Sequence, residues 1–203
     1  MARPRLILAS ASPRRRELLQ EYGYVFDVIL PDGEETDARI LDMPPARRAQ
    51  TISLHKAEST ARLIESGYVL AGDTIAALGD RVFGKPRDRR DARAILAALA
   101  GTTHQVITGV TLLDAATGRR EVRHDVTHVT MKPLSEEEIA IYLDTGPWKG
   151  KAGAYGIQDR GDAFVERIEG SFTNVVGFPM ELITRMLADW GLHPNSDSKA
   201  TRT

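Results

Sequence analysis

The sequence predicts an α/β protein built on a mixed, not purely parallel, sheet. Segments typical of strands alternate with segments typical of helices in both halves of the chain. Two pairs of neighbouring strand segments are joined by short turns, Gly79-Asp80 and residues 114–118, which indicates antiparallel hairpins. A chain of 203 residues buries roughly 70% of its unfolded surface. We therefore expect one domain over residues 1–193, with one large or two small lobes, and a disordered polar tail over 194–203.

The first half of the chain begins with a strand and a helix whose boundaries are clearly marked. An apolar run over residues 6–9 predicts a buried strand, Ser12 is expected as the N-cap of a helix that starts at Pro13, and Gly23 follows its end. The pattern then predicts a strand over 25–30, a helix over 44–66, a central strand over 68–78 and a hairpin strand over 81–83.

One helix of this half combines an apolar face with a lysine. Ala49, Ile52 and Leu63 recur along one stripe of the helix over 44–66, which predicts the face that packs on the core. Lys56 lies in the same stripe. It either extends to the rim of the core, as lysines on apolar faces do, or serves a site.

The second half has equally definite signals. Asp88 predicts the cap of a helix through Leu99, and Ser135 with Glu138 forms a capping box for a helix that ends near Gly146. The remaining predicted elements are strands over 105–113, 121–131, 163–168 and 171–176, a glycine-rich loop over 148–161, and a last helix over 179–191.

Composition excludes several functional classes. The 27 basic and 28 acidic residues leave a net charge of -1, which argues against wholesale binding to nucleic acid or to an anionic membrane surface. The absence of cysteine excludes disulfides, thiolate metal sites and cysteine nucleophiles. The apolar run near the start is too short for a signal peptide or a membrane span, so we expect a cytoplasmic protein. Among five histidines only His124 and His128 are closely spaced, which does not mark a zinc site.

Two arginines stand where a helix disfavours positive charge. Arg14 and Arg15 fall in the first turn of the helix after Pro13, at the positive end of its dipole. A phosphate bound at this helix start would explain them. The alternative is a solvated basic face on a surface helix.

A carboxylate interrupts the most apolar strand of the chain. Asp73, within Gly72-Asp73-Thr74, must meet a cation, a metal ion or hydrogen-bond donors, because an uncompensated buried carboxylate costs several kcal/mol. It is either a site residue at a cleft or a structural acid paired with a buried lysine or arginine. Glu34 and Glu35 lie on a loop, where glutamates usually face water.

Further polar residues complete a candidate phosphate site. Lys85 lies on the rigid turn Gly84-Lys85-Pro86, which the hairpin can return to the strand that carries Asp73. Lysines and arginines around one or two carboxylates fit a polyphosphate with a divalent ion such as Mg²⁺. The stretch from Lys149 to Gly156 is neither a P-loop nor a dinucleotide motif, but its glycines permit a ligand to approach the backbone. Gln158 could read a base edge or simply face solvent.

Together these motifs resemble the Maf family of nucleoside triphosphate pyrophosphatases. The resemblance covers about residues 6–179 and rests on three stretches in order: residues 8–15 (LASASPRR), Gly72-Asp73-Thr74 with Gly84-Lys85-Pro86, and residues 151–158 (KAGAYGIQ). It implies a two-lobed α/β fold like that of inosine triphosphatase, with an elongated mixed central sheet and a cleft between the lobes. It also implies a divalent cation, Mg²⁺ or Mn²⁺, and a homodimer.

The resemblance also implies roles for single residues. Asp73 would be the general base or metal-anchoring acid, Glu35 its partner carboxylate (Glu34 being the alternative alignment) and Lys85 a further catalytic group. The implied substrate-binding residues are Ser10, Arg14, Arg15, Lys56, Thr74, Lys151 and Gln158. Arg14, Thr74 and Gln158 match the branch that acts on dTTP and UTP better than the branch that acts on 7-methylguanosine triphosphate. Gly72 and Asp159 depart from the residues expected at their positions.

The predicted reaction is metal-assisted attack of water on the α-phosphorus, which releases a nucleoside monophosphate and pyrophosphate. Such an enzyme would hydrolyse dTTP, UTP and modified pyrimidine nucleotides in the precursor pool. One alternative is a non-catalytic, nucleotide-binding regulator of cell division, and another is a phosphomonoesterase. An acid beside the phosphates argues against the former, because it repels a polyphosphate unless it brings a metal or activates water. The lack of a legible nucleophile or two-metal carboxylate cluster argues against the latter.

Overall fold

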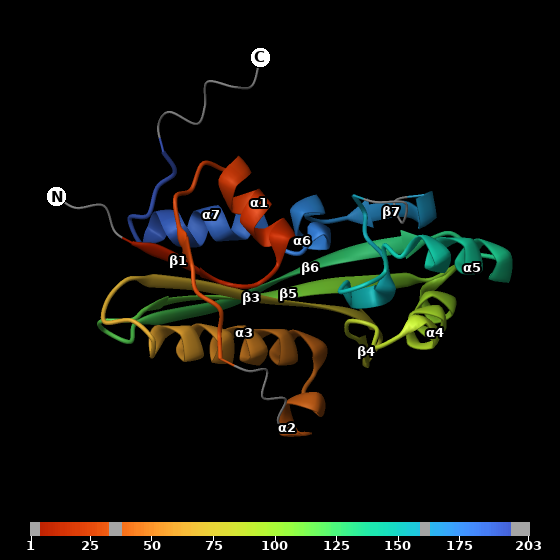
Figure 1. Cartoon of the computed structure of the whole chain (residues 1–203), viewed down its shortest axis with the longest axis horizontal. Coiled ribbons are helices and arrows are strands. Elements are labelled where there is room, and N and C mark those ends of the chain that lie inside the picture. The colour runs from red at the N-terminus through yellow and green to blue at the C-terminus, as the bar shows by residue number, and fades with distance from the viewer. Residues whose placement is uncertain (1–4, 33–37, 159–162, 196–203) are drawn as a thin grey trace, which may run out of the picture.

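A seven-stranded mixed sheet runs along the longest axis of the molecule, with helices on both faces (Figure 1). The computed structural model describes residues 5–32, 38–158 and 163–195. The strands are β1 (Leu6–Ala9), β2 (Asp27–Val28), β3 (Tyr68–Leu78), β4 (Arg81–Phe83), β5 (Thr103–Asp114), β6 (Arg120–Met131) and β7 (Val165–Glu169). The helices are α1 (Pro13–Glu21), α2 (Ala38–Leu41), α3 (Pro45–Ala61), α4 (Arg89–Leu99), α5 (Glu136–Thr145), η1 (Ala152–Ala154), α6 (Phe172–Val176) and α7 (Met180–Asp189).

The sheet is mixed, as the hairpins predict. Its order is β2-β1-β3-β5-β6-β7, with β4 attached to β3. β1 is parallel to β2 and β3, whereas the pairs β3–β4, β3–β5, β5–β6 and β6–β7 are antiparallel. The central position of β3 is confirmed, and Asp73 therefore lies in the middle of the sheet.

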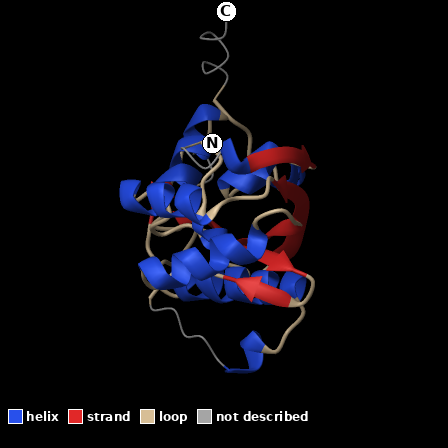
Figure 2. Cartoon of the chain, turned by 90° about the vertical axis from the view of Figure 1, so that its right-hand side faces the viewer, coloured by secondary structure: helices blue, strands red, loops and turns tan. Residues whose placement is uncertain are grey.

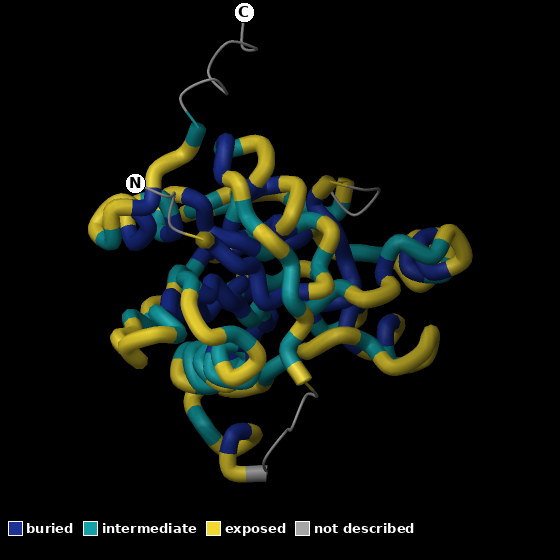
Figure 3. The backbone as a smooth tube through the Cα atoms, turned by 60° about the vertical axis from the view of Figure 1, so that its left-hand side comes forward, coloured by how far each residue is buried: buried dark blue, intermediate teal, exposed yellow. Residues whose placement is uncertain are grey.

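The helices divide the core into separate clusters. α3 covers one face of the sheet, and α1, α6 and α7 cover the other (Figures 1 and 2). The largest cluster lies under α1 and α7 around Leu8, Leu70 and Phe178, and the second lies at the far end of the sheet, under α4 and α5, around Leu96 and Tyr142. Figure 3 shows the buried residues gathered between exposed helix faces and loops. The two clusters lie toward opposite ends of the long strands β3, β5 and β6, which agrees with the two-lobed fold that the resemblance implies.

Most predicted elements are confirmed, and one is wrong in type. Residues 171–176 form the helix α6 instead of a strand. Ser171 caps this helix, since its Oγ accepts a hydrogen bond from the backbone N–H of Asn174, and Gly177 ends it at a φ of 122°. The β-branched residues of this segment favour a strand, but the N-cap at Ser171 favours a helix, and the helix forms. The predicted strand over 25–30 is also shorter than expected, with only Asp27–Val28 paired.

The buried face of α3 differs from the predicted stripe. Ala49, Ser53, Ala57 and Thr60 are buried against the sheet, whereas Ile52 is half-buried and Leu63 is exposed. Small residues are needed here because the helix lies very close to β5: a Cβ added at Gly109 would be 2.2 Å from the Ala49 carbonyl oxygen. Apolar periodicity alone does not show such close packing.

Two further predictions fall partly or wholly outside the described residues. These are the expected disorder of the tail, of which only residues up to 195 are described, and the placement of Glu34 and Glu35. No helix in the described part of the chain is both long and apolar enough to cross a bilayer.

Candidate active site

The candidate site forms where one edge of β3 lacks a strand partner. β1 pairs with β3 as far as Ala71, and β4 pairs with it only from Ala76. Between them lie Gly72, Asp73, Thr74 and Ile75, whose other edge is held by β5. The backbone at this gap can bond to side chains or ligands instead of to a strand, as expected for a site at a sheet interruption.

A cavity of about 830 Å³ opens at this gap. It brings together nearly all of the predicted site residues, from β1, α1, α3, β3, the β4–α4 turn and the loop around η1. Those that line it are Ser10, Arg14, Arg15, Lys56, Asp73, Thr74, Lys85, Lys151 and Gln158. Glu35, with its alternative Glu34, lies outside the described residues. Cations outnumber acids in the lining, which suits a polyanion.

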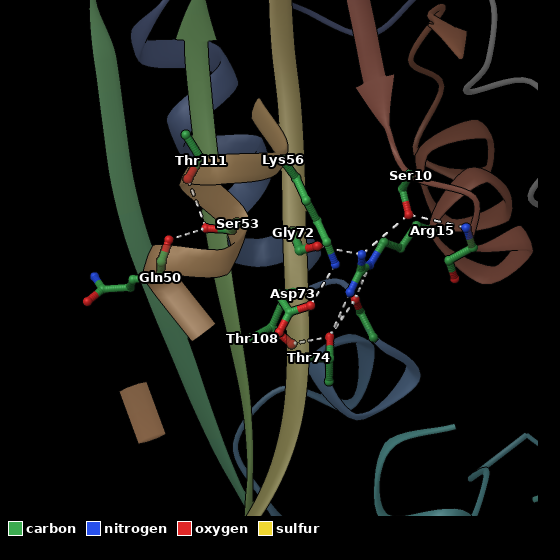
Figure 4. A network of polar contacts seen from close by, with 12 residues as sticks. Ser10, Arg15, Gln50, Ser53, Lys56, Gly72, Asp73, Thr74, Thr108 and Thr111 are labelled. Atoms are coloured by element: carbon green, nitrogen blue, oxygen red, sulfur yellow. Dashed lines mark hydrogen bonds and ion pairs between the residues drawn. The ribbon is translucent and has the colours of Figure 1, made fainter. Parts of the chain in front are cut away.

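Asp73 is paired with Lys56. The Lys56 Nζ lies 2.8 Å from Asp73 Oδ1, and the two side chains are only 13% and 16% exposed (Figure 4). The acid therefore has the buried cationic partner that one interpretation required, and it also faces the cavity that the other required. Among the described residues no hydrogen bond is made to its second oxygen, Oδ2, which is available for water or an ion.

The position of Lys56 depends on how α3 is held to the sheet. Ser53, one turn earlier, shares a buried hydrogen bond of 2.8 Å with Thr111 on β5 (Figure 4). The close approach at Gly109 brings the same helix down on the sheet. Because Lys56 leaves α3 beside this contact, its Nζ reaches across β3 to Asp73.

Arg15 is bound by the protein at several points. Its Nε donates to the Gly177 carbonyl (2.9 Å), its NH1 to the Gly72 carbonyl (2.6 Å) and Ser10 Oγ (3.3 Å), and its NH2 to Thr74 Oγ1 (3.0 Å). Burial lowers the pKa of Arg15, while the neighbouring Asp73 raises it and Arg14 lowers it. These oxygens explain a cation in the first turn of α1 without a bound anion. Arg14 is half-buried and lines the cavity.

The turn before α1 is shaped for this arginine. Ser12 is the N-cap, as predicted, but its side chain makes no capping hydrogen bond. Its backbone N–H instead donates to Ser10 Oγ at 3.2 Å, the same oxygen that Arg15 contacts. Ser10 is thereby placed at the cavity wall, although it is itself nearly buried.

Thr74 is held by three neighbours. Its Oγ1 accepts from Arg15, shares a hydrogen bond of 2.9 Å with Thr108 and lies 3.2 Å from the Gly177 carbonyl (Figure 4). Phe178 packs behind, 5.6 Å from the Arg15 guanidinium to the ring centroid. A Cβ on Gly72 would approach the Phe178 ring to 2.9 Å, so glycine at this position makes room for that ring.

The loop at η1 forms another wall of the cavity. Gly153 has a φ of 74°, and its N–H donates to the carbonyl of Gly84, next to Lys85. Ala154 has a φ of 61°, which is uncommon for a residue with a side chain. Lys151 Nζ donates to the Pro147 carbonyl, so this cation is already engaged within the loop.

Sequence reasoning left the histidines without a role, and the structure assigns one to His104. His104 on β5 is 1% exposed, and its Nε2 lies 2.8 Å from the hydroxyl of Tyr155, a residue of the cavity lining. Burial lowers the pKa of His104 to about 4 and raises the pKa of Tyr155, so both are neutral near pH 7. The pair anchors the strained loop. The only signal in the sequence was a histidine next to the predicted apolar strand, and no local pattern links it to Tyr155, 51 residues later.

Two carboxylates of the described residues, Asp73 and Glu17, line the cavity, and Asp73 is the one at the gap in the sheet. No group of three histidine, aspartate or glutamate side chains among them could hold a metal by itself. Mg²⁺, however, is often held by one or two carboxylates together with substrate phosphates. Asp73, with Oδ2 available in a cavity rich in cations, fits that arrangement.

Comparison with known proteins agrees with this geometry. The family model described as "Maf-like protein" matches residues 5–190. A dTTP/UTP pyrophosphatase of Pelotomaculum thermopropionicum is 41% identical over 186 residues, which is 92% of this chain and 96% of the relative. One of Carboxydothermus hydrogenoformans is 42% identical over 187 residues, 92% and 99% of the two chains. A third, of Alkaliphilus metalliredigens, is 43% identical over 176 residues, 87% and 91%. The chain belongs to the Maf family.

Proposed function

We propose that this protein is a nucleoside triphosphate pyrophosphatase that hydrolyses dTTP and UTP to the monophosphate and pyrophosphate. The observation that carries the proposal is a partly buried acid, Asp73, in a cavity whose other charged residues are mainly cations. The three relatives are each named dTTP/UTP pyrophosphatase, which supports this substrate class.

Asp73 is proposed as the general base. A water molecule between its Oδ2 and the α-phosphorus gives up a proton to the carboxylate as its oxygen attacks. The bond from the α-phosphorus to the bridging oxygen breaks, and pyrophosphate leaves with that oxygen. Lys56 orients the carboxylate before the attack, since its Nζ contacts Oδ1.

The cations of the cavity stabilise the charge that develops on the leaving group. Phosphoryl transfer depends mainly on positioning and electrostatic stabilisation, so preorganised cations contribute most. Lys56 and Lys85 line the cavity together with Asp73 and would contact the leaving phosphates, and Arg14 lines the same cavity and would contact the α-phosphate. Arg15 acts in this proposal by holding Ser10 and Thr74 at the cavity wall.

A divalent ion completes the proposed site. Asp73 would hold it together with Glu35 and the substrate phosphates, and Mg²⁺ or Mn²⁺ would neutralise phosphate charge there. Because these ions prefer oxygen ligands, the carboxylates suit them better than the histidines do.

The base is proposed to bind on the side of Thr74, Tyr155 and Gln158. These residues line the same cavity as Asp73. A glutamine amide both donates and accepts, which suits the imide edge of thymine or uracil. Lys151 contributes to the wall on this side.

The test is product analysis. The protein is incubated with each common nucleoside triphosphate and Mg²⁺ or Mn²⁺, and the products are separated by chromatography. Monophosphate and pyrophosphate from dTTP and UTP support the proposal. Orthophosphate would indicate a phosphomonoesterase, and unchanged nucleotide a non-catalytic regulator, and either result overturns it. Parallel reactions with a chelator measure the requirement for the ion.

We also propose a cytoplasmic homodimer with one catalytic domain per chain. The family match over residues 5–190 supports one domain. Sedimentation analysis of the purified protein tests the dimer.

A further inference from the structure

A second cavity meets the first at the catalytic pair. It measures about 610 Å³ and shares with the first cavity the residues Lys56, Asp73, Thr74, Ile75 and Lys85. Its other walls come mostly from the outward side of α3. Asp73 is therefore accessible from two cavities.

The chain segment over residues 30–32 contributes to both cavities. Leu30 and Pro31 line the first, and Asp32 lines the second. This segment is fixed to α3, because the N–H of Asp32 donates to Ser59 Oγ at 2.9 Å. The two cavities therefore adjoin along this segment and at Asp73.

The second cavity presents a polar strip of α3. His55, Ser59 and Arg62 are four and three residues apart, so their side chains follow one face of the helix over about 10 Å. Lys56 and Lys85 stand beside this strip. Arg48 lies two turns earlier, and its buried Nε has no hydrogen-bond partner among the described residues.

The acids of the second cavity are largely compensated. Glu58 pairs with Arg120 at 3.2 Å, and Asp73 pairs with Lys56. Asp32 is then the remaining acid, against Arg48, Arg62 and Lys85. The balance is positive, which favours an anion.

The lining also favours a phosphate group over a nucleobase as the occupant. Its apolar members, Ile52, Leu63 and Ile75, are aliphatic, and the cavity has no aromatic residue except His55. The first cavity, in contrast, has Tyr155 and Gln158. The half of the substrate that carries no base therefore fits the second cavity better.

From this arrangement we infer that the second cavity binds the pyrophosphate product, through His55 and Arg62 with Lys85. The inference rests on the proposed function. The monophosphate remains in the first cavity, and the bond that breaks lies between them, beside Asp73. Each product then has its own way out.

The test measures binding without turnover. Inorganic pyrophosphate with Mg²⁺ is titrated into the full chain by calorimetry, and UMP is titrated separately. In the double variant His55→Ala/Arg62→Ala we expect pyrophosphate affinity to fall about tenfold, because charge-assisted contacts are lost, and UMP affinity to stay within about twofold. Both side chains are exposed, so the variant should fold, which circular dichroism checks. Arg93→Ala, an exposed arginine on α4, is the matched control.

A competition titration sharpens the result. Saturating UMP should leave pyrophosphate bound, because the two products occupy different cavities. The inference is overturned if the wild-type chain does not bind pyrophosphate, if the double variant binds it as well as the wild type, if both ligands weaken equally, or if UMP displaces it. Hydrolysis assays test the proposed function separately. If pyrophosphate binds as expected but UTP is not hydrolysed, only the proposed reaction is refuted. If UTP is hydrolysed but pyrophosphate does not bind as expected, only the second cavity's role is refuted.

Discussion

Lys56 on α3 and Asp73 on β3 form an ion pair of 2.8 Å at the point where β3 has no neighbouring strand on one edge. The pair joins the helix on one face of the sheet to the strand at its centre. Since both side chains are mostly buried, each depends on the other for compensation of its charge.

Replacing Asp73 by Asn should remove the general base and preserve the shape of the side chain. We expect turnover to fall by roughly a thousandfold or more, as for loss of a general base, while the circular dichroism spectrum is unchanged. Asp125→Asn on β6 is a matched control, and its turnover should equal that of the wild type. An Asp73→Asn variant with wild-type turnover would refute the assignment.

Replacing Lys56 by Met should leave Asp73 partly buried without its cation. We expect the free energy of unfolding to fall by about 1–3 kcal/mol, less than for a fully buried pair because both groups retain some exposure. Urea denaturation measures this change. The double variant Lys56→Met/Asp73→Asn should recover most of the stability and none of the activity. If the double variant is as unstable as Lys56→Met alone, the unpaired charge of Asp73 is not the cause of the lost stability.

The four hydrogen bonds of Arg15 make a prediction about stability. Arg15→Lys keeps the charge, but one ammonium group cannot reproduce the planar fork that reaches the carbonyls of Gly72 and Gly177. We expect a loss of about 2–4 kcal/mol in the free energy of unfolding, because the carbonyls of Gly72 and Gly177 each lose their arginine donor. Thermal or urea denaturation checks this. Unchanged stability with a raised KM would instead make Arg15 a direct substrate ligand.

Packing of α3 on β5 is tested at Gly109. In Gly109→Ala the new Cβ would meet the Ala49 backbone at 2.2 Å, so α3 must move and carry Lys56 with it. Both stability and kcat should fall. Gly118→Ala is the control: nothing lies within 4 Å of its Cβ, and its φ of 73° should cost about 1 kcal/mol without changing kcat. Equal kcat values for the two variants would contradict this account of α3.

His104 predicts a dependence of stability on pH. Its pKa of about 4 in the folded protein lies below the ordinary histidine value of 6.5, so the unfolded chain binds the proton more tightly. The neutral, buried His104 contributes fully to the free energy of unfolding above about pH 6.5. This contribution is lost as the pH falls through 4, which changes the free energy of unfolding by an amount on the order of 2–4 kcal/mol. His104→Gln can keep the bond to Tyr155 but does not titrate. The difference in unfolding free energy between wild type and variant should therefore change over this range, and a constant difference would contradict the prediction.

Local signals were sufficient for much of the fold. The proline that starts α1, the capping box of α5 and the Gly79-Asp80 turn each act within a few residues, and the structure places these elements as predicted. They failed at α6, where the β-branched residues predict a strand but the N-cap at Ser171 starts a short helix. They also failed for the inner face of α3, which depends on a glycine in a distant strand.

The composition of the site could be predicted, but its internal contacts could not. Lys85 and Lys151 line the cavity as the motifs suggested. Arg15, in contrast, donates to backbone carbonyls. Because every residue has a backbone carbonyl, the residue types in the sequence do not predict these partners. Tyr155 likewise meets His104 only because β5 lies beneath the η1 loop.

The most direct test of the central claim is the fate of water oxygen. The chain is allowed to hydrolyse UTP with Mg²⁺ in ¹⁸O-labelled water, and the products are analysed by mass spectrometry. Attack on the α-phosphorus beside Asp73 places the label in UMP and leaves pyrophosphate unlabelled. Label in pyrophosphate or in orthophosphate would contradict the account.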